Sequence, residues 1–168
     1  PIVSNMQVQF AILGSGEPSL QADFSRLASI YGGKVGVYIG YDNALSHMIE
    51  AGSDFFVMPS RFEPCGLNQL YSMAYGTPPI VRHTGGLADT VSQYMESSAS
   101  GDGFVFYDAT TSALYNTIGW ACSTYYDRKS DYLKLRENGM KKDFSWKKSA
   151  LEYSQLYTWA INQRSGLM

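Results

Sequence analysis

Short apolar runs and longer amphipathic segments alternate along the first two-thirds of the chain. The apolar runs predict strands at residues 6–13, 35–39, 55–58, 79–81 and 103–107. Apolar residues spaced three or four apart predict helices at 18–31, 42–50 and 67–75. Strands that alternate with helices indicate a parallel, doubly wound sheet of the Rossmann-like α/β class. From residue 112 onward the pattern is helical, with a last helix at about 145–163, so we expect a helical carboxy-terminal tail.

The apolar positions of the first two predicted helices define the faces that we expect to turn toward the sheet. The first helix carries Leu20, Phe24, Leu27 and Ile30 on one face. The second helix has an equivalent set at Ala44, Leu45, Met48 and Ile49.

Residues 59–67 form a polar elbow between the third predicted strand and the helix that follows it. The carboxyl ends of parallel strands are where open α/β sheets bind ligands. The elbow contains Glu63, Cys65 and Gly66. A glycine near a helix start lets a ligand approach free backbone N–H groups. The elbow therefore predicts a ligand site, although Arg61 and Glu63 could instead form an ordinary surface pair.

Composition is consistent with one folded unit. The 168 residues are 45% hydrophobic and 17% charged, which is enough for a single core. No apolar run approaches the roughly 20 residues of a membrane span, and residues 1–5 lack a basic start and a cleavage pattern. Two cysteines, Cys65 and Cys122, are too few for a disulfide framework or a zinc site. We expect a soluble, cytoplasmic protein without a metal or cofactor.

Charge is divided unevenly between the two ends of the chain. Residues 1–127 carry four Lys and Arg against eleven Asp and Glu, whereas residues 128–168 carry nine against four. The basic side chains near the carboxyl end alternate with Asp131, Glu137 and Asp143 at helical spacing, which is typical of a solvated helix face. We therefore predict no nucleic-acid partner. Near the elbow only Arg61 and Arg82 supply positive charge, fewer cations than a pyrophosphate prefers.

Two long motifs follow the third predicted strand: Ser-Arg-Phe-Glu-Pro-Cys-Gly-Leu-Asn-Gln-Leu-Tyr at 60–71 and Tyr-Gly-Thr-Pro-Pro-Ile-Val-Arg-His-Thr-Gly-Gly-Leu-Ala-Asp-Thr-Val at 75–91. Both closely resemble motifs of the bacterial glycogen synthases and plant starch synthases. Shorter similar words occur in the family's order at 13–18, 37–41, 45–47 and 143–146. These proteins are retaining glucosyltransferases of the GT-B fold that use ADP-glucose. The resemblance covers nearly the whole chain.

The resemblance implies that residues 1–168 are most of a carboxy-terminal nucleotide-sugar-binding domain. The family's amino-terminal domain, and an Arg and a Lys that grip the donor phosphates, would lie outside this chain. The implied reaction transfers glucose from ADP-glucose to the non-reducing end of an α-1,4-glucan. Its partners would be the nucleotide sugar, the glucan acceptor and the amino-terminal domain. We expect no membrane partner, a plastid location if the parent is of plant type, and no transfer by the isolated chain.

The resemblance also implies roles for individual residues. Glu63 matches the acidic residue beside the transferred glucose, where a carboxylate favours positive charge at the anomeric carbon. Tyr41 matches the aromatic residue that stacks on adenine, although rim packing is the alternative. The donor site would further include Cys65, Gly66, Leu67 and Asn68. Cys65 would serve in packing, and the family often has Thr in place of Asn68.

Other readings remain open from the sequence. Wider glycosyltransferase families carry a second Glu eight positions after the first, where this chain has Tyr71, and this favours an ADP-glucose-type donor. A UDP-glucose enzyme and a non-catalytic nucleotide- or glucan-binding module are the rivals. Residues 84–87, Thr-Gly-Gly-Leu, allow either close backbone approach to a phosphate or glucan, or a plain turn before a helix at Ala88. A lone helical histidine such as His47 is typically a packed residue.

Overall fold

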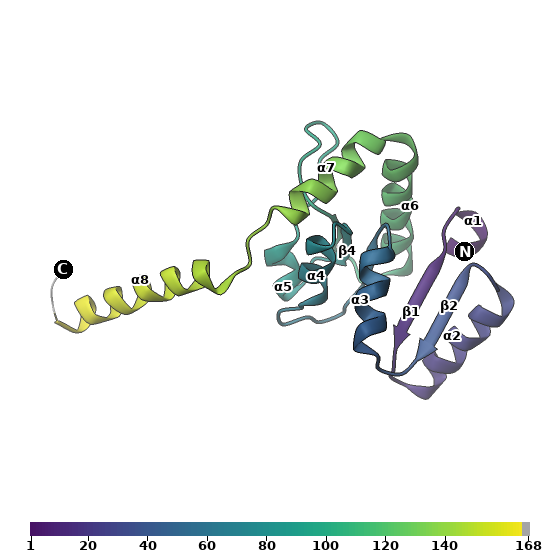
Figure 1. Ribbon diagram of the computed structural model, residues 1–168, viewed down its shortest axis with the longest axis horizontal. Helices are drawn as coiled ribbons and strands as arrows, with labels where there is room; N and C mark the ends of the chain where they lie inside the picture. The colour runs from purple at the N-terminus through teal and green to yellow at the C-terminus, as the bar shows by residue number, and fades with distance from the viewer. Residues whose placement is uncertain (166–168) are drawn as a thin grey trace.

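The computed structural model describes residues 1–165 (Figure 1). Its first part contains, in order, α1 (Ile2–Asn5), β1 (Phe10–Gly14), α2 (Pro18–Ile30), β2 (Val35–Ile39) and α3 (Asn43–Gly52). β1 and β2 pair in parallel, with Phe10 opposite Val35 and Gly14 opposite Ile39. The strand expected at 6–13 begins instead at Phe10, because it extends only as far as β2 provides a partner. The short helix α1 was not predicted.

A second parallel sheet follows α3. Its elements are β3 (Phe56–Met58), α4 (Asn68–Ala74), β4 (Pro79–Arg82), α5 (Gly85–Thr90) and β5 (Phe104–Phe106). The strands lie in the order β3-β4-β5. Pro79 begins β4, and Pro59 follows directly on β3, two positions where proline does not interrupt a ladder.

Helices cover both faces of the three-stranded sheet. On one face Ile80 and Phe104 pack with Ile118 and Leu135, which lie on α6 (Thr111–Asp127) and α7 (Lys129–Met140). On the opposite face Val81 and Val105 join a second cluster with residues of α4 and α5. This arrangement explains why these strands read as continuous apolar runs rather than as alternating ones.

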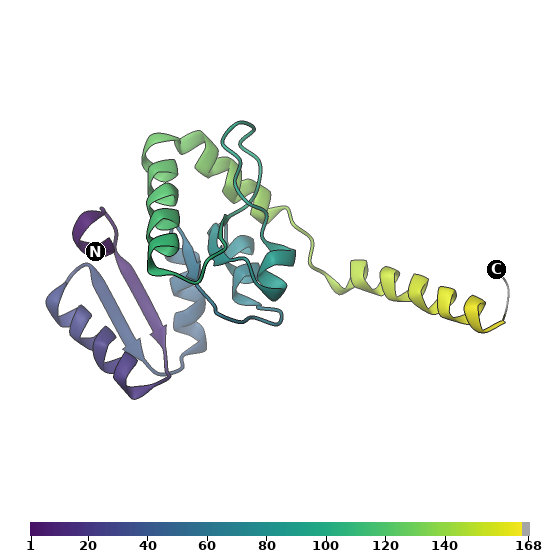
Figure 2. The ribbon, with the colours of Figure 1, turned by 180° about the vertical axis from the view of Figure 1, so that it is seen from behind.

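The last helix, α8 (Trp146–Ser165), extends away from the rest of the molecule (Figures 1 and 2). None of its residues is buried. No helix within residues 1–165 combines the length and the apolar character that crossing a membrane requires.

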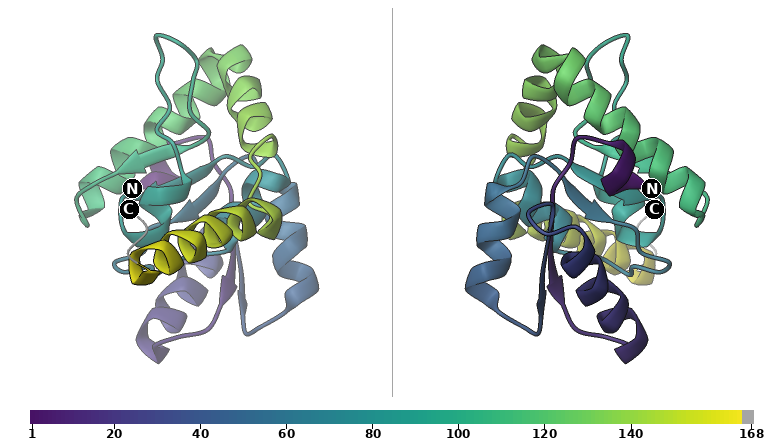
Figure 3. Two further views of the ribbon diagram at one scale, coloured as in Figure 1. Left: turned by 90° about the vertical axis from the view of Figure 1, so that its left-hand side faces the viewer. Right: turned by 90° about the vertical axis from the view of Figure 1, so that its right-hand side faces the viewer.

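The α/β class and the parallel strands agree with the prediction, but the strands form two sheets rather than one continuous sheet. Figure 1 shows β1 and β2, with α2, to one side of β4, and Figure 3 shows the molecule from its two ends. The faces expected to turn inward on α2 and α3 are consequently only partly covered. Leu20 and Ile30 are 54% and 61% exposed, and Met48 is 64% exposed. Ala44 is also exposed. These helices lack enough neighbouring strands to pack against.

Candidate functional site

The polar elbow follows β3 and leads into α4, as the sequence predicts. Arg82 on β4 braces its first residues: its Nε donates a hydrogen bond to the carbonyl oxygen of Ser60 at 2.9 Å, and Nη2 donates to the carbonyl oxygen of Arg61. Arg82, one of the two cations near the elbow in sequence, therefore already donates its hydrogen bonds to backbone carbonyl oxygens. The side chain of Arg61 is exposed.

Gln69, which the sequence analysis did not single out, holds the second half of the elbow. It is fully buried, and its Nε2 donates to the carbonyl oxygens of Cys65 at 3.1 Å and Gly66 at 2.9 Å. The same nitrogen donates to Oγ1 of Thr90 on α5 at 3.1 Å. The sequence offered one signal for this role. Gln69 lies four residues before Met73, so the two side chains share one face of the helix, and Met73 is buried.

The doubled glycine of residues 84–87 packs against the elbow itself. A Cβ atom at Gly85 would overlap the carbonyl oxygen of Glu63, and one at Gly86 would overlap the carbonyl oxygen of Cys65. The amide of Gly86 donates to the carbonyl oxygen of Glu63 at 3.1 Å. Close backbone approach thus occurs within the protein, and α5 begins at Gly85, three residues before the helix start expected at Ala88.

Glu63 is half-buried on the elbow, where Oγ of Ser60 donates to its Oε2 at 3.4 Å. No ion pair between Glu63 and Arg61 occurs in the part of the chain that the structure describes. The surface-pair interpretation of these two residues is therefore not supported. The arrangement leaves a carboxylate beyond the carboxyl end of β3, an edge strand of the sheet, with a hydrogen bond from Ser60.

A hollow of about 340 Å³, here called the strand-end hollow, lies where the ends of β1 and β2 meet α3 and α4. Its lining includes Gly14 at the end of β1, Gly40 and Tyr41 after β2, and Asn68 and Tyr71 on α4. Tyr41 is 86% exposed, so its ring is accessible from solvent. The fold thus brings Tyr41 and Asn68 together although they lie 27 positions apart in sequence.

The other predicted site residues lie on the elbow outside the lining of this hollow. Cys65 and Leu67 are exposed, and Gly66 adopts a φ of +75°, which favours glycine. Glu63 also lies on the elbow, outside the lining of the strand-end hollow. The predicted residues therefore form two neighbouring sets, one in the strand-end hollow and one along the elbow.

His47 and Glu50 from α3 also line the strand-end hollow. The ring of His47 packs against Tyr71 and Tyr75, with centroids 5.6 and 6.0 Å away, and the Tyr75 hydroxyl lies 3.3 Å from Nδ1. These are the contacts of a packed histidine. Glu50 is buried, and burial raises the pKa of its carboxyl above 4.5, an effect that the nearby His47 opposes.

Comparison with known proteins identifies relatives. Residues 2–142 match the family model described as glycosyl transferases group 1. The chain is 51% identical over 162 residues to glycogen synthase 1 of Geobacter sulfurreducens and 46% identical over 167 residues to glycogen synthase of Treponema denticola. These matches cover 96% and 99% of the chain but 32% and 34% of the relatives. The chain therefore spans about a third of their length.

Solved structures agree with the sequence relatives. The catalytic domain of starch synthase IV from Arabidopsis thaliana, bound to ADP and acarbose, superposes with a TM-score of 0.80 at 38% identity. That match covers 92% of this chain and 32% of the starch synthase chain. Sucrose-phosphate synthase from Thermosynechococcus elongatus gives a TM-score of 0.68 at 25% identity, over 96% and 41% of the two chains. With parallel strands and carboxy-terminal helices that match the carboxy-terminal domain of a GT-B starch synthase, this chain belongs to the glycosyl transferases of group 1.

Proposed function

We propose that this chain is the donor-binding part of a retaining glucosyltransferase that moves glucose from ADP-glucose to the non-reducing end of an α-1,4-glucan. The whole enzyme would be a glycogen or starch synthase. Support comes from the relatives named glycogen synthase and from the starch synthase structure bound to ADP and acarbose.

The observation that carries the proposal is the strand-end hollow. It lies at the carboxyl ends of parallel strands, where α/β sheets bind nucleotides. An exposed tyrosine on its rim, Tyr41, offers a ring face for a base, and Asn68 offers an amide for polar groups of the ligand. An ADP group seated on Tyr41 would direct its phosphates toward the elbow.

We assign the transfer chemistry to the elbow. In a retaining transfer, positive charge develops at the anomeric carbon as the bond to the diphosphate breaks. The carboxylate of Glu63 would orient hydroxyl groups of the sugar and favour that charge. Cys65, Gly66 and Leu67 would line the sugar and diphosphate, with Cys65 in a packing role.

The isolated chain is expected to transfer no glucose. Arg82 already binds backbone carbonyls, so the elbow of this chain offers little free positive charge to a diphosphate. The test is incorporation of labelled glucose from ADP-glucose into glycogen, with the longer protein as the positive control. Measurable elongation by residues 1–168 alone would contradict this expectation.

Calorimetric titration with ADP, AMP and UDP tests the donor site directly. Weak binding that prefers the adenine nucleotides is expected, and Tyr41→Ala should abolish it through loss of stacking. Tyr153→Ala is the matched control, because Tyr153 is an exposed tyrosine on α8, outside the strand-end hollow. Glu63→Ala should leave nucleotide binding nearly unchanged in this chain and should abolish transfer in the longer protein.

The rival functions give different results in the same titration. Preference for UDP would indicate a UDP-glucose enzyme. Adenine binding by the longer protein without glucan elongation would indicate a non-catalytic binding module. Equal binding by wild type and Tyr41→Ala would remove Tyr41 from the site.

A further inference from the structure

His83 and Tyr107 form a stacked ring pair just beyond the carboxyl ends of β4 and β5. Their ring centroids are 4.8 Å apart, and the ring planes are inclined by 30°. Arg82 is the register partner of Phe106 at the ends of these two strands. His83 and Tyr107 are the next residue of each strand, and neighbouring strands lie about 4.8 Å apart. The sheet itself therefore sets the two rings at stacking distance.

The ring pair lies outside the core. His83 is exposed, and Tyr107 is 66% exposed. Within residues 1–165, no hydrogen bond engages the imidazole of His83 or the hydroxyl of Tyr107. Because each ring holds the other in place, a ligand that binds there orders few additional side-chain rotamers. The pair thus offers flat apolar faces together with polar edges that can still form hydrogen bonds.

Arg82 connects the ring pair to the elbow. Its Nη1 donates to the carbonyl oxygen of Tyr107 at 3.4 Å. Its Nε and Nη2 donate to the carbonyl oxygens of Ser60 and Arg61 on the elbow. One guanidinium group therefore fixes the start of the elbow relative to Tyr107. Because the strands lie in the order β3-β4-β5, the elbow, His83 and Tyr107 follow the ends of three successive strands.

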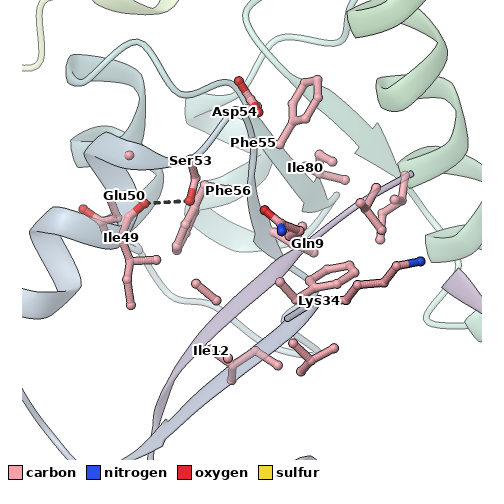
Figure 4. Close-up of a pocket in the computed structure, with 18 of the residues that line it drawn as sticks. Gln9, Ile12, Lys34, Ile49, Glu50, Ser53, Asp54, Phe55, Phe56 and Ile80 are labelled. Atoms are coloured by element: carbon pink, nitrogen blue, oxygen red, sulfur yellow. Dashed lines mark hydrogen bonds between the residues drawn. The ribbon is translucent and has the colours of Figure 1, made fainter. Parts of the chain in front are cut away.

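The ring pair and the strand-end hollow lie on different sides of the elbow. A groove of about 1400 Å³ between the two sheets (Figure 4) is lined by Ile12 of β1 and Phe56 of β3, and none of residues 104–106 of β5 lines it. β3 is therefore nearer to β1 than β5 is. The strand-end hollow is lined from the ends of β1 and β2, and its lining includes neither His83 nor Tyr107.

This placement matters for a transfer reaction at Glu63. A nucleotide in the strand-end hollow would occupy the side of the elbow that faces β1 and β2. An acceptor chain that is longer than a few sugar units must then extend on another side. The ring pair lies on the side toward β5, and it is joined to the elbow through Arg82.

The chemistry of the ring pair suits a sugar. The C–H groups on one face of a pyranose pack against an aromatic ring, while the hydroxyl groups at its rim bond to polar groups at the ring edge. The Tyr107 hydroxyl and the His83 imidazole can both donate and accept such bonds. Phosphate groups would instead prefer cations, and the neighbouring Arg82 already donates to backbone carbonyl oxygens.

We infer that the His83–Tyr107 ring pair is a subsite for the acceptor glucan, where it contacts glucose units away from the end that receives the new glucose. The glucan runs from the elbow across His83 to Tyr107. This inference rests on the proposed function and adds residues that hold the acceptor. Both residues bind the chain at a distance from the anomeric carbon, so neither is a catalytic residue.

Acceptor length provides the first test, in the longer natural protein with ADP-glucose as donor. Tyr107→Ala should lower kcat/KM for maltoheptaose about fivefold, the effect of losing one aromatic contact, and should leave kcat/KM for maltose unchanged. Maltose occupies only the positions next to the elbow. The KM for ADP-glucose should also stay unchanged. Tyr107→Phe keeps the ring and is the matched control, with the wild-type preference for maltoheptaose.

Binding without a donor separates this inference from the proposed function. Calorimetric titration of the longer protein with maltoheptaose should show about fivefold weaker binding by Tyr107→Ala and by His83→Ala. Such binding by a protein that does not elongate glucan would support the ring pair and refute the proposed function. Elongation whose acceptor preference ignores both substitutions would support the proposed function and refute the ring pair.

Three results would overturn the inference. Equal losses with maltose and maltoheptaose would give Tyr107 a structural role only. A higher KM for ADP-glucose with an unchanged KM for maltoheptaose would place the ring beside the donor. Unchanged maltoheptaose binding by both alanine variants would exclude contact with the glucan. Because both side chains are exposed, each variant should keep the wild-type urea midpoint, and this measurement verifies that it folds.

Discussion

Residues 10–39 and residues 54–140 are built from the same kinds of elements but differ in how they are buried. The earlier region, β1–α2–β2, contributes one buried hydrophobic residue, Val35, to the described core. The later region contributes all the others, including Phe104, Tyr94 and Leu135. Its three strands have helices on both faces, whereas β1 and β2 have few neighbours.

This difference shows that a segment can form its secondary structure without contributing to a buried core. The amphipathic pattern of α2 is sufficient to predict a helix, yet Leu20 and Ile30 stay more than half exposed. An apolar face contributes to stability only when another surface removes it from water. The earlier region therefore forms strands and a helix, but few of its apolar side chains are covered by another part of the described structure.

Removal of a large side chain should give the greatest contrast between the two regions. Phe104→Ala empties a fully buried site among Tyr94, Phe55 and Trp120, and we expect it to cost about 3–5 kcal/mol. Phe24→Ala in α2 removes a residue that is 38% exposed and should cost about 1–2 kcal/mol. Urea unfolding followed by circular dichroism measures both. Equal losses would mean that the two regions share one core.

Two glycine substitutions test the backbone packing of the same regions. Gly86→Ala forces a methyl group into the carbonyl of Cys65 and should cost about 1–3 kcal/mol. Gly36→Ala in β2 meets no atom closer than the Phe10 carbonyl oxygen at 3.9 Å, so it should be neutral within about 0.5 kcal/mol. Thermal unfolding of the two variants measures the difference. A neutral Gly86→Ala would show that the elbow moves easily away from α5.

The pH dependence of stability provides the smallest and most local test. Burial raises the pKa of Glu50 above 4.5, so the folded state binds its proton more tightly than the unfolded state. Stability should decrease as pH rises from 4.5 through this raised pKa, and Glu50→Gln should remove that slope. Unfolding in urea between pH 4 and pH 8 measures it.

Glu137 provides a control of opposite sign. Hydrogen bonds from Lys141 and Lys134 lower the pKa of its exposed carboxyl below 4.5. Its small contribution to stability is therefore present above pH 4.5 and is lost as pH falls through the lowered pKa. Glu137→Gln should leave the stability change above pH 4.5 unaltered. If Glu50→Gln also left the fall in stability above pH 4.5 unaltered, that fall could not be assigned to Glu50.

Several features of the fold could be predicted because they depend on nearby residues. Asp42 precedes α3 and accepts a hydrogen bond from the Leu45 amide at 2.9 Å, a local cap. Phe56 to Met58 form a strand that ends before Pro59, and the elbow follows. The candidate site was partly accessible in the same way: the resemblance selected Tyr41 and Asn68, and the fold brings both into one hollow.

Other features could not be predicted because they depend on residues distant in sequence. Gln69 was overlooked because its partner Thr90 lies 21 positions away. Arg82 was named as a cation near the elbow, but its bonds to the carbonyl oxygens of Ser60 and Arg61 were not predicted, because these acceptors lie more than 20 positions away. The role of Gly85 and Gly86 depends on the path of the elbow that packs on them.

The sequence by itself determined the order of strands and helices, the parallel α/β class and the elbow motif, because hydrophobic period, proline and glycine act within a few residues. Only the tertiary structure decided which apolar faces are buried, which side chains brace the elbow and where the sheet is divided. Burial and strand pairing join segments that are far apart in the chain. Whether an edge such as that of β1 stays open depends on which strands pair with β1, and residues distant in sequence decide that pairing.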